Sequence, residues 1–324
     1  MPPVVRSWTF VVVVFLVLLS VVVLVRHQNK SDVSSVALER VRPNPPAGYV
    51  LPAARSLRAH TNVGNAVAHP LVWISPSATN YSGGVAALRS LPIELTVEHV
   101  DRLRDALAVP YTPAMGFSLV EYNGIRNDAA DLLLRQPQFP PDLLFDFSEM
   151  FSDSTQDAVW RDYCLQMLAT GWKNLASRND PDSEAARALA VSVLGEAAGA
   201  QSRWAGTALL GLQAMMTTDA PSVDENEFAE QVFHVVSNAA ASEQNRITAV
   251  RLAGMHGIYD ACPAVRKIAQ TGETETLRGA AIATLGEIGD EQDHDFLLEI
   301  ASGSDRFLKK IAEKAIVALK ESKR

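Results

Sequence analysis

The stretch TLRGAAIATLGEIGDEQD, residues 276–293, decides how this sequence folds. Its apolar side chains recur at the spacing that places them on one stripe of an α-helix: Leu277, Ala281, Leu285 and Ile288. Gly289 follows that stripe directly, and a glycine there predicts a left-handed residue that ends the helix. Asp290 or Asp293 is then expected to cap a second helix. The stretch therefore predicts two helices joined by a short turn.

The same pattern recurs along the chain. In each copy an arginine is followed by a small residue three positions later, and in the better copies by a glycine eight positions later. The copies begin at Arg126, Arg161, Arg187, Arg203, Arg246 and Arg278. The last two lie 32 residues apart and carry Gly254 and Gly286, whereas the other intervals are irregular. One helix pair cannot bury both of its apolar stripes, so the repetition predicts pairs that stack on one another.

Helical spacing continues from residue 96 to the C-terminus. Thr96 is expected to cap the first helix, whose apolar residues share one face: Val97, Val100, Leu103 and Leu107. Further helical blocks lie near 124–135, 141–151, 156–175, 183–198, 202–216, 225–240, 244–257, 263–270, 276–288, 294–301 and 306–321. No segment of comparable length alternates apolar and polar residues as a strand would. The sequence therefore predicts an all-α body over residues 96–324.

The final copies resemble a known repeat. Residues 277–301, LRGAAIATLGEIGDEQDHDFLLEIA, are similar to the short HEAT-like repeats of phycobilin lyases and of many bacterial proteins with no known activity. The positions that match the family pattern are Arg278, Ala281, Leu285, Gly286, Ile288, Gly289 and Asp290. The resemblance covers residues 244–320 well and reaches loosely back to residue 124. It implies a right-handed α-solenoid of HEAT-like helix pairs, but it specifies no chemistry, so lyase activity does not carry over.

The resemblance also implies structural roles for the repeat positions, which are Arg187, Arg203, Arg246, Arg278, Gly254, Gly286, Gly289 and Asp290. The arginines are expected to cross a helix pair and to bond loop carboxylates between adjacent repeats, such as Asp290 or Asp182. Contact with a ligand is the alternative. Cys164 occupies the position of a small residue and is expected to be buried, which disfavours a disulfide with Cys262.

An apolar segment near the N-terminus predicts a membrane anchor. Residues 8–25, WTFVVVVFLVLLSVVVLV, carry no charge, and a helix of that length spans roughly 27 Å, close to the hydrocarbon thickness of a bilayer. The alternatives are a cleaved signal peptide and a buried core helix. An uncleaved signal-anchor helix after a short tail, residues 1–7, is favoured because the segment exceeds the usual signal-peptide core and no A-x-A-like site follows closely.

The membrane orientation rests on weaker signals. More Lys and Arg residues follow the apolar segment than precede it, which would place the body in the cytoplasm. Long domains, however, translocate largely regardless of charge. We therefore favour a single-pass protein of a bacterial inner membrane with an extracytoplasmic body.

Two proline-containing segments separate the apolar segment from the helices. Residues 26–58, with RPNPPAGYVLP, are expected to form an extended stalk. Residues 59–95 are expected to form an irregular N-terminal extension, in which YSGGVAAL from Tyr81 is a glycine-rich turn. Val72, Trp73 and Ile74 of this extension are expected to dock on a neighbouring apolar surface.

The sequence contains no recognisable catalytic or metal-binding arrangement. None of the seven histidines forms an H-E-x-x-H pair, and no G-x-S-x-G, P-loop or G-x-G-x-x-G motif occurs. The DHDF stretch, residues 293–296, lies where solvated Asp and His are ordinary. The net charge of −8 argues against a nucleic-acid partner, which would require a basic face. We expect no catalytic residue, cofactor or metal.

Aromatic residues in the middle of the array are candidates for binding a partner. They are Trp160, Tyr163, Trp172, Trp204, Phe228 and Phe233, and among them Trp172 and Trp204 are the candidate partner-binding residues. The sequence thus predicts a membrane-anchored HEAT-like scaffold or adaptor that binds the bilayer through residues 8–25 and an unidentified protein through the solenoid. The alternative is an enzyme, or an enzyme's regulatory subunit, whose site is formed by residues 60–113 against the first helices. A pocket that contains His69 or His99 beside a carboxylate would favour that alternative.

Overall fold

The computed structural model describes residues 71–75, 78–217 and 223–322. All of them belong to one unit of the chain, Pro43–Arg324. The predicted tail, anchor helix and stalk, residues 1–58, lie outside the described residues. None of the helices described is both long and apolar enough to cross a membrane.

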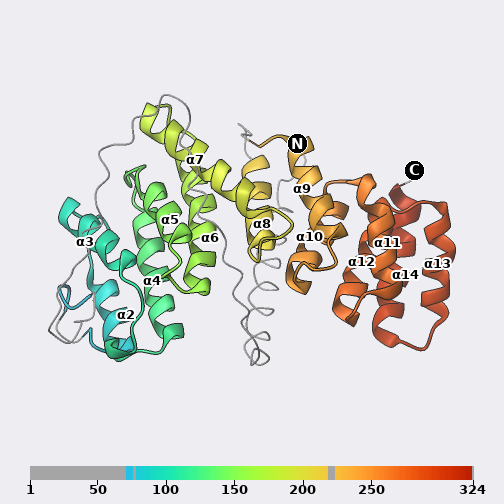
Figure 1. Ribbon diagram of the computed structural model, residues 1–324, viewed down its shortest axis with the longest axis horizontal. Helices are drawn as coiled ribbons and strands as arrows, with labels where there is room; N and C mark the ends of the chain where they lie inside the picture. The colour runs from blue at the N-terminus through green and yellow to red at the C-terminus, as the bar shows by residue number, and fades with distance from the viewer. Residues whose placement is uncertain (1–70, 76–77, 218–222, 323–324) are drawn as a thin grey trace, which may run out of the picture. The chain divides into compact units, whose positions relative to one another are not determined.

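The described part of the chain consists of α-helices joined by short loops and two 3-10 turns, with no strand (Figure 1). The α-helices are α2 (Tyr81–Ser90), α3 (Val97–Ala108), α4 (Leu119–Leu134), α5 (Leu143–Ser152), α6 (Ala158–Leu175), α7 (Pro181–Ala197), α8 (Ala205–Met216), α9 (Glu225–Ser237), α10 (Glu243–Met255), α11 (Cys262–Thr271), α12 (Glu275–Ile288), α13 (Glu291–Ser302) and α14 (Arg306–Ser322). The 3-10 turns are η1 (Pro113–Met115) and η2 (Tyr259–Ala261). The predicted all-α architecture is confirmed.

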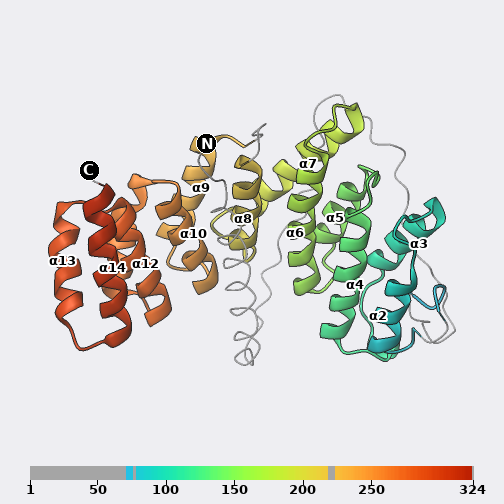
Figure 2. The same cartoon turned by 180° about the vertical axis from the view of Figure 1, so that it is seen from behind.

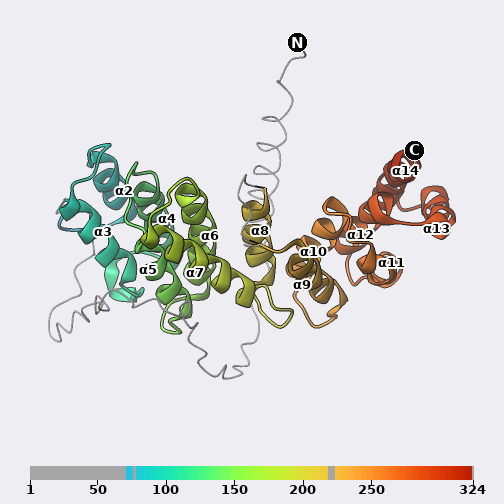
Figure 3. The same ribbon diagram turned by 90° about the horizontal axis from the view of Figure 1, so that it is seen from above.

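The helices pack in two layers. In the even-numbered layer, α4 packs against α2 and α6, α8 against α6 and α10, and α12 against α10 and α14 (Figure 2). Each odd-numbered helix from α3 to α13 contacts an even-numbered neighbour, and Figure 3 shows α3, α5 and α7 on one side of α2, α4 and α6. This succession of neighbouring pairs is consistent with an α-solenoid.

The stretch that decides the fold forms α12 and the start of α13. Leu277, Ala281, Leu285 and Ile288 are all buried, as their spacing predicts. Gly286 faces α14, and a Cβ atom at this position would lie 2.7 Å from the Cα atom of Ala315. The glycine therefore allows two helix backbones to approach closely.

The prediction of a left-handed Gly289 is wrong. Gly289 has a φ of −70° and is extended, and the chain passes directly from it into the cap of α13. A glycine is required there for a different reason, since a Cβ atom would collide with the carbonyl oxygen of Leu285. Positive φ values occur instead at Gly116 and Gly257.

Polar side chains cap most helices as the sequence predicts. The Thr96 hydroxyl accepts a hydrogen bond from the His99 amide, and the His99 side chain accepts one from the Thr96 amide, which makes a capping box. Asp290 caps α13 in the same reciprocal way with Asp293. These caps satisfy amide groups that have no partner within the helix.

The N-terminal extension is less irregular than predicted. Residues 81–90 form α2, so the glycine-rich stretch from Tyr81 is a helix rather than a turn. Its Gly84 faces the Ile125 side chain of α4, and this tight packing favours a residue without a side chain. Trp73 and Ile74 pack against the core as expected, with the Trp73 ring beside His99 and Arg102 of α3.

Candidate functional site

The repeated arginines mostly bond backbone carbonyls. Arg187 of α7 donates to the carbonyl oxygens of Leu175 and Arg178, each at 2.5 Å, and Arg278 of α12 donates to that of Ala269 at 3.2 Å. Leu175 and Ala269 lie in the last turn of the preceding helix, where carbonyl groups have no intrahelical donor. The guanidinium groups therefore cap the end of one helix from the beginning of the next.

Arginines do bond loop carboxylates, but the pairs differ from those that the sequence predicts. Arg246 of α10 pairs with Glu273, in the loop before α12, at 2.9 Å. Asp290 pairs at 3.0 Å with Arg266 of α11, and not with Arg278. Asp182 forms no bond with a repeat arginine in the described structure. Gly254, the repeat glycine of α10, faces the Glu287 side chain of α12.

The arginine of the first copy is a core residue. Arg126 is 2% exposed, donates to the Leu107 carbonyl and to Gln156 Oε1, and stacks on the Trp160 ring at 3.8 Å from the ring centroid. Burial lowers the pKa of Arg126 to about 10. This guanidinium group links α3, α4 and α6 within the protein and is closed to a partner.

Trp172 is not available to a partner. Its side chain is 1% exposed and packs in the core along α6, which corrects its interpretation as a partner-binding residue. The helical spacing that placed Trp172 in α6 did not determine which face of that helix is covered. Cys164 is buried and unoxidised, as expected of a small core residue, and Cys262 is also a free thiol.

Trp204 lies in a surface cluster that we call the arginine–tryptophan patch: Phe151, Arg161, Arg203 and Trp204. The half-buried Trp204 ring stands at the start of α8 and meets the Phe151 ring edge to face, with centroids 5.2 Å apart. The guanidinium carbons of Arg161 and Arg203 lie 4.4 and 5.6 Å from the centroid of the Trp204 ring. Two cations thus share one aromatic ring.

The charges of the two patch arginines are not neutralised by an ion pair within the described residues. Asp153, whose charge acts on Arg161, accepts hydrogen bonds from Thr155 with both carboxylate oxygens. Asp162, close to Arg203, accepts from Thr207 at 2.7 Å and from Gln166 at 3.0 Å. Burial and then the positive charge of Arg203 lower the pKa of Arg161. The patch therefore carries two like charges, which Asp153 and Asp162 attract from beyond ion-pair distance.

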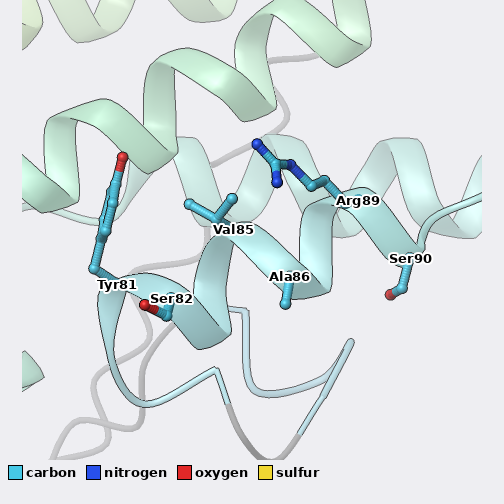
Figure 4. Close-up of a pocket in the computed structure, with 6 residues that line it drawn as sticks. All are labelled: Tyr81, Ser82, Val85, Ala86, Arg89 and Ser90. Carbon is cyan, nitrogen blue, oxygen red and sulfur yellow. The ribbon is translucent and has the colours of Figure 1, made fainter.

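A pocket with His69 or His99 beside a carboxylate would favour the alternative site in residues 60–113. His69 lies outside the described residues, and His99 Nδ1 is 3.1 Å from the Thr96 hydroxyl within the capping box. An open hollow of about 600 Å³ does lie along α2 (Figure 4), and its lining residues are Tyr81, Ser82, Val85, Ala86, Arg89 and Ser90. This hollow contains neither a histidine nor a carboxylate in its described lining.

In the DHDF stretch, Asp293 does not pair with His294. The Asp293 carboxylate is buried and bonded to Arg266, whereas His294 Nδ1 lies 3.7 Å from the exposed carboxylate of its neighbour Asp295. Across the ranges that the structure covers, no three His, Cys, Asp or Glu residues are arranged to hold a metal ion. The Arg266–Asp293 pair instead connects α11 to the cap of α13.

Comparison with known families supports the repeat architecture. The family model described as HEAT repeats matches residues 234–317, from within α9 to within α14. Comparison with curated proteins and with solved structures returns no significant match. The match and the all-helical architecture together support a HEAT-like repeat protein. The arginine–tryptophan patch lies N-terminal to the matched segment.

Proposed function

We propose that this protein is a scaffold or adaptor that binds a protein partner through its HEAT-like helical repeats and performs no catalysis of its own. HEAT repeats commonly act as interaction scaffolds, because stacked pairs present an extended surface to a partner. The single observation that carries the proposal is the unbroken succession of packed helices from α2 to α14 in the even-numbered layer. The hollow along α2 lies within 60–113, but its described lining has neither the histidine nor the carboxylate that the alternative of an enzyme site requires.

We further propose that residues 8–25 anchor the protein in a bacterial inner membrane and that the stalk, residues 26–58, holds the helical body outside the cytoplasm. The support is the uncharged sequence of the apolar segment and its length. An anchored scaffold would hold its partner at the membrane surface. The stalk would keep the scaffold and its partner near one another and so raise their effective concentration there.

Crosslinking in intact membranes tests the scaffold proposal. Cells that express the full chain are treated with a membrane-permeant crosslinker, and the proteins joined to the chain are identified by mass spectrometry. We expect the same partner in repeated experiments, and we expect to lose it when Gly286→Leu disrupts the packing of α12 on α14. A chain that repeatedly captures no protein would contradict a scaffold function.

Alkaline carbonate extraction tests the anchor. The full chain should remain in the membrane pellet, and deletion of residues 8–25 should release it. Deletion of residues 31–48, which removes a stalk segment of the same length, is the matched control and should leave the protein in the pellet. Release of the full chain by carbonate would contradict the anchor. Protease added outside spheroplasts should digest the body, and a protected body would contradict the proposed orientation.

A further inference from the structure

The hydrogen-bond donors of the arginine–tryptophan patch are only partly used. Arg161 Nε donates to the Phe151 carbonyl at 2.6 Å, but its two terminal nitrogens make no hydrogen bond within the described residues. The exposed guanidinium group of Arg203 makes none there at all. Both groups are positioned by stacking on Trp204. A stacked guanidinium group is oriented but keeps its N–H edge available for a carboxylate.

The unused N–H donors of Arg161 and Arg203 are suited to an added carboxylate. Burial and then the charge of Arg203 lower the pKa of Arg161, while the charge of Asp153 raises it, and Asp162 is attracted to Arg203. Neither aspartate approaches the arginines as an ion pair, because Asp153 and Asp162 bind hydroxyl and amide donors. Asp157, at the start of α6, accepts from Asn123 and from the amides of its own helix. A carboxylate that reached both guanidinium groups would relieve their repulsion and form charge-assisted hydrogen bonds.

The surroundings favour a protein segment over a nucleic acid. Val159 is 52% exposed and follows Ala158, whose carbonyl accepts a hydrogen bond from Trp204 Nε1, so an exposed apolar residue is next in the chain to a contact of Trp204. The chain carries a net charge of −8, which repels any anion but repels the long polyanion of a nucleic acid more strongly than a short acidic segment. We propose that the arginine–tryptophan patch binds an acidic peptide segment of the partner protein. This inference rests on the proposed scaffold function.

Peptide binding to the full chain in a neutral detergent tests the proposal. The probe is a fluorophore-labelled peptide of six glutamates with blocked ends, and the same peptide with six glutamines is its control. We expect fluorescence anisotropy to detect binding of the glutamate peptide alone. We expect that binding to weaken as salt is raised, because solvent-exposed charges are screened.

The decisive variant is Arg203→Gln, since Arg203 is exposed and its removal breaks no hydrogen bond that supports the fold. We expect it to weaken binding of the glutamate peptide about 5- to 10-fold, the loss of one charge-assisted contact. Arg306→Gln removes the same charge from an exposed arginine at the start of α14 and should leave binding unchanged. Arg203→Lys keeps the charge without the planar fork and should bind at an intermediate level.

Several outcomes would overturn the proposal. They are no binding of the glutamate peptide to the unmodified chain, equal binding by Arg203→Gln and Arg306→Gln, or equal binding of the glutamine peptide. A six-nucleotide oligothymidine that bound more tightly than the glutamate peptide would assign the patch to nucleic acid instead. If the crosslinked partner were retained by Arg203→Gln at full yield, the scaffold function would stand and the patch would not be its binding site.

Discussion

Arg126 shows how a charged side chain can be a core residue in this protein. Its guanidinium group bonds the last turn of α3 and Gln156, and Gln156 in turn donates to the Ala108 carbonyl at 2.9 Å. The group nevertheless has no carboxylate partner within 4 Å among the described residues, and its Nε and Nη1 atoms make no hydrogen bond there. Hydrogen bonds and stacking on Trp160 therefore offset a large cost of burying the charge.

We expect Arg126→Ala to lower the free energy of unfolding by about 3 kcal/mol, because it leaves a cavity and removes the donors to Leu107 and Gln156. Arg126→Met fills much of the same volume without a buried charge and should recover more than half of that loss. Urea denaturation followed by circular dichroism measures both. Arg135→Ala, at an exposed position, is the control. Equal losses in Arg126→Ala and Arg126→Met would show that the hydrogen bonds, and not the packing, dominate.

At the scale of the helices, two glycines at the same position of the repeat have different surroundings. A Cβ atom at Gly286 of α12 would lie 2.7 Å from the Cα atom of Ala315, whereas one at Gly195 of α7 would meet only Gln231 Nε2 at 3.8 Å. Gly286 therefore permits a close approach of two backbones, and Gly195 has room for a methyl group. The sequence pattern alone does not distinguish the two positions.

Alanine at these two positions should have opposite effects. Gly286→Ala should destabilise the protein by about 1–3 kcal/mol, because α14 must move away. Gly195→Ala should stabilise it by about 0.5–1 kcal/mol, because alanine favours a helix over glycine. The midpoints of urea unfolding of the two variants provide the comparison. A gain in stability for Gly286→Ala would contradict the close packing of α12 and α14.

The link between α11 and α13 predicts a pH dependence. Burial by itself would raise the pKa of Asp293, but hydrogen bonds from Arg266 and from the Asp290 amide hold this pKa below its usual value. The folded state therefore binds this proton less readily than the unfolded chain, whose Asp pKa is about 3.9. The stabilisation is present above that pH and is lost as the pH falls below it.

Asp293→Asn tests this dependence. The variant should be less stable than the unmodified chain at neutral pH, because the Arg266 ion pair and the cap of α13 are weakened. The difference should narrow at about pH 3, where the unfolded chain binds a proton at Asp293 and folding has to release it. Urea unfolding at neutral pH and at about pH 3 measures this difference in stability. A difference that stayed constant would show that the carboxylate charge contributes nothing.

At the scale of the whole molecule, local features of the sequence predicted more of the fold than of the candidate site. Three features depend on residues close together in the sequence, and all three were predicted. They are the apolar stripe of α12 that contains Leu285, the helix cap at Thr96 and the all-α architecture. The helix α2 was missed because its adjacent glycines disfavour a helix, and the packing of Gly84 on Ile125 and the Asn80 cap help to compensate. The error at Gly289 arose because a terminal glycine fits either a left-handed or an extended exit.

Only part of the arginine–tryptophan patch could be predicted from the sequence. Arg203 and Trp204 are adjacent, and Trp204 was a candidate partner-binding residue. Arg161 and Phe151 reach the same ring from the ends of other helices, and that arrangement depends on how α6 packs beside α8. Such pairings require the relative position of two helices, which single-helix spacing does not provide.

Because the helix pairs stack one after another, we expect a deletion at one end of the array to destabilise mainly the adjacent helices. In a repeat array each pair contacts mainly its neighbours, so stability is roughly a sum of pair and interface contributions. Deletion of residues 290–324 removes α13 and α14 and uncovers the face of α12 that packs on α14. We expect hydrogen exchange, followed by mass spectrometry, to accelerate strongly in α12 and less in α10. Exchange in α4 and α6 should match the full chain, because neither helix packs against the deleted pair. Faster exchange throughout residues 78–217 would instead indicate one cooperative unit.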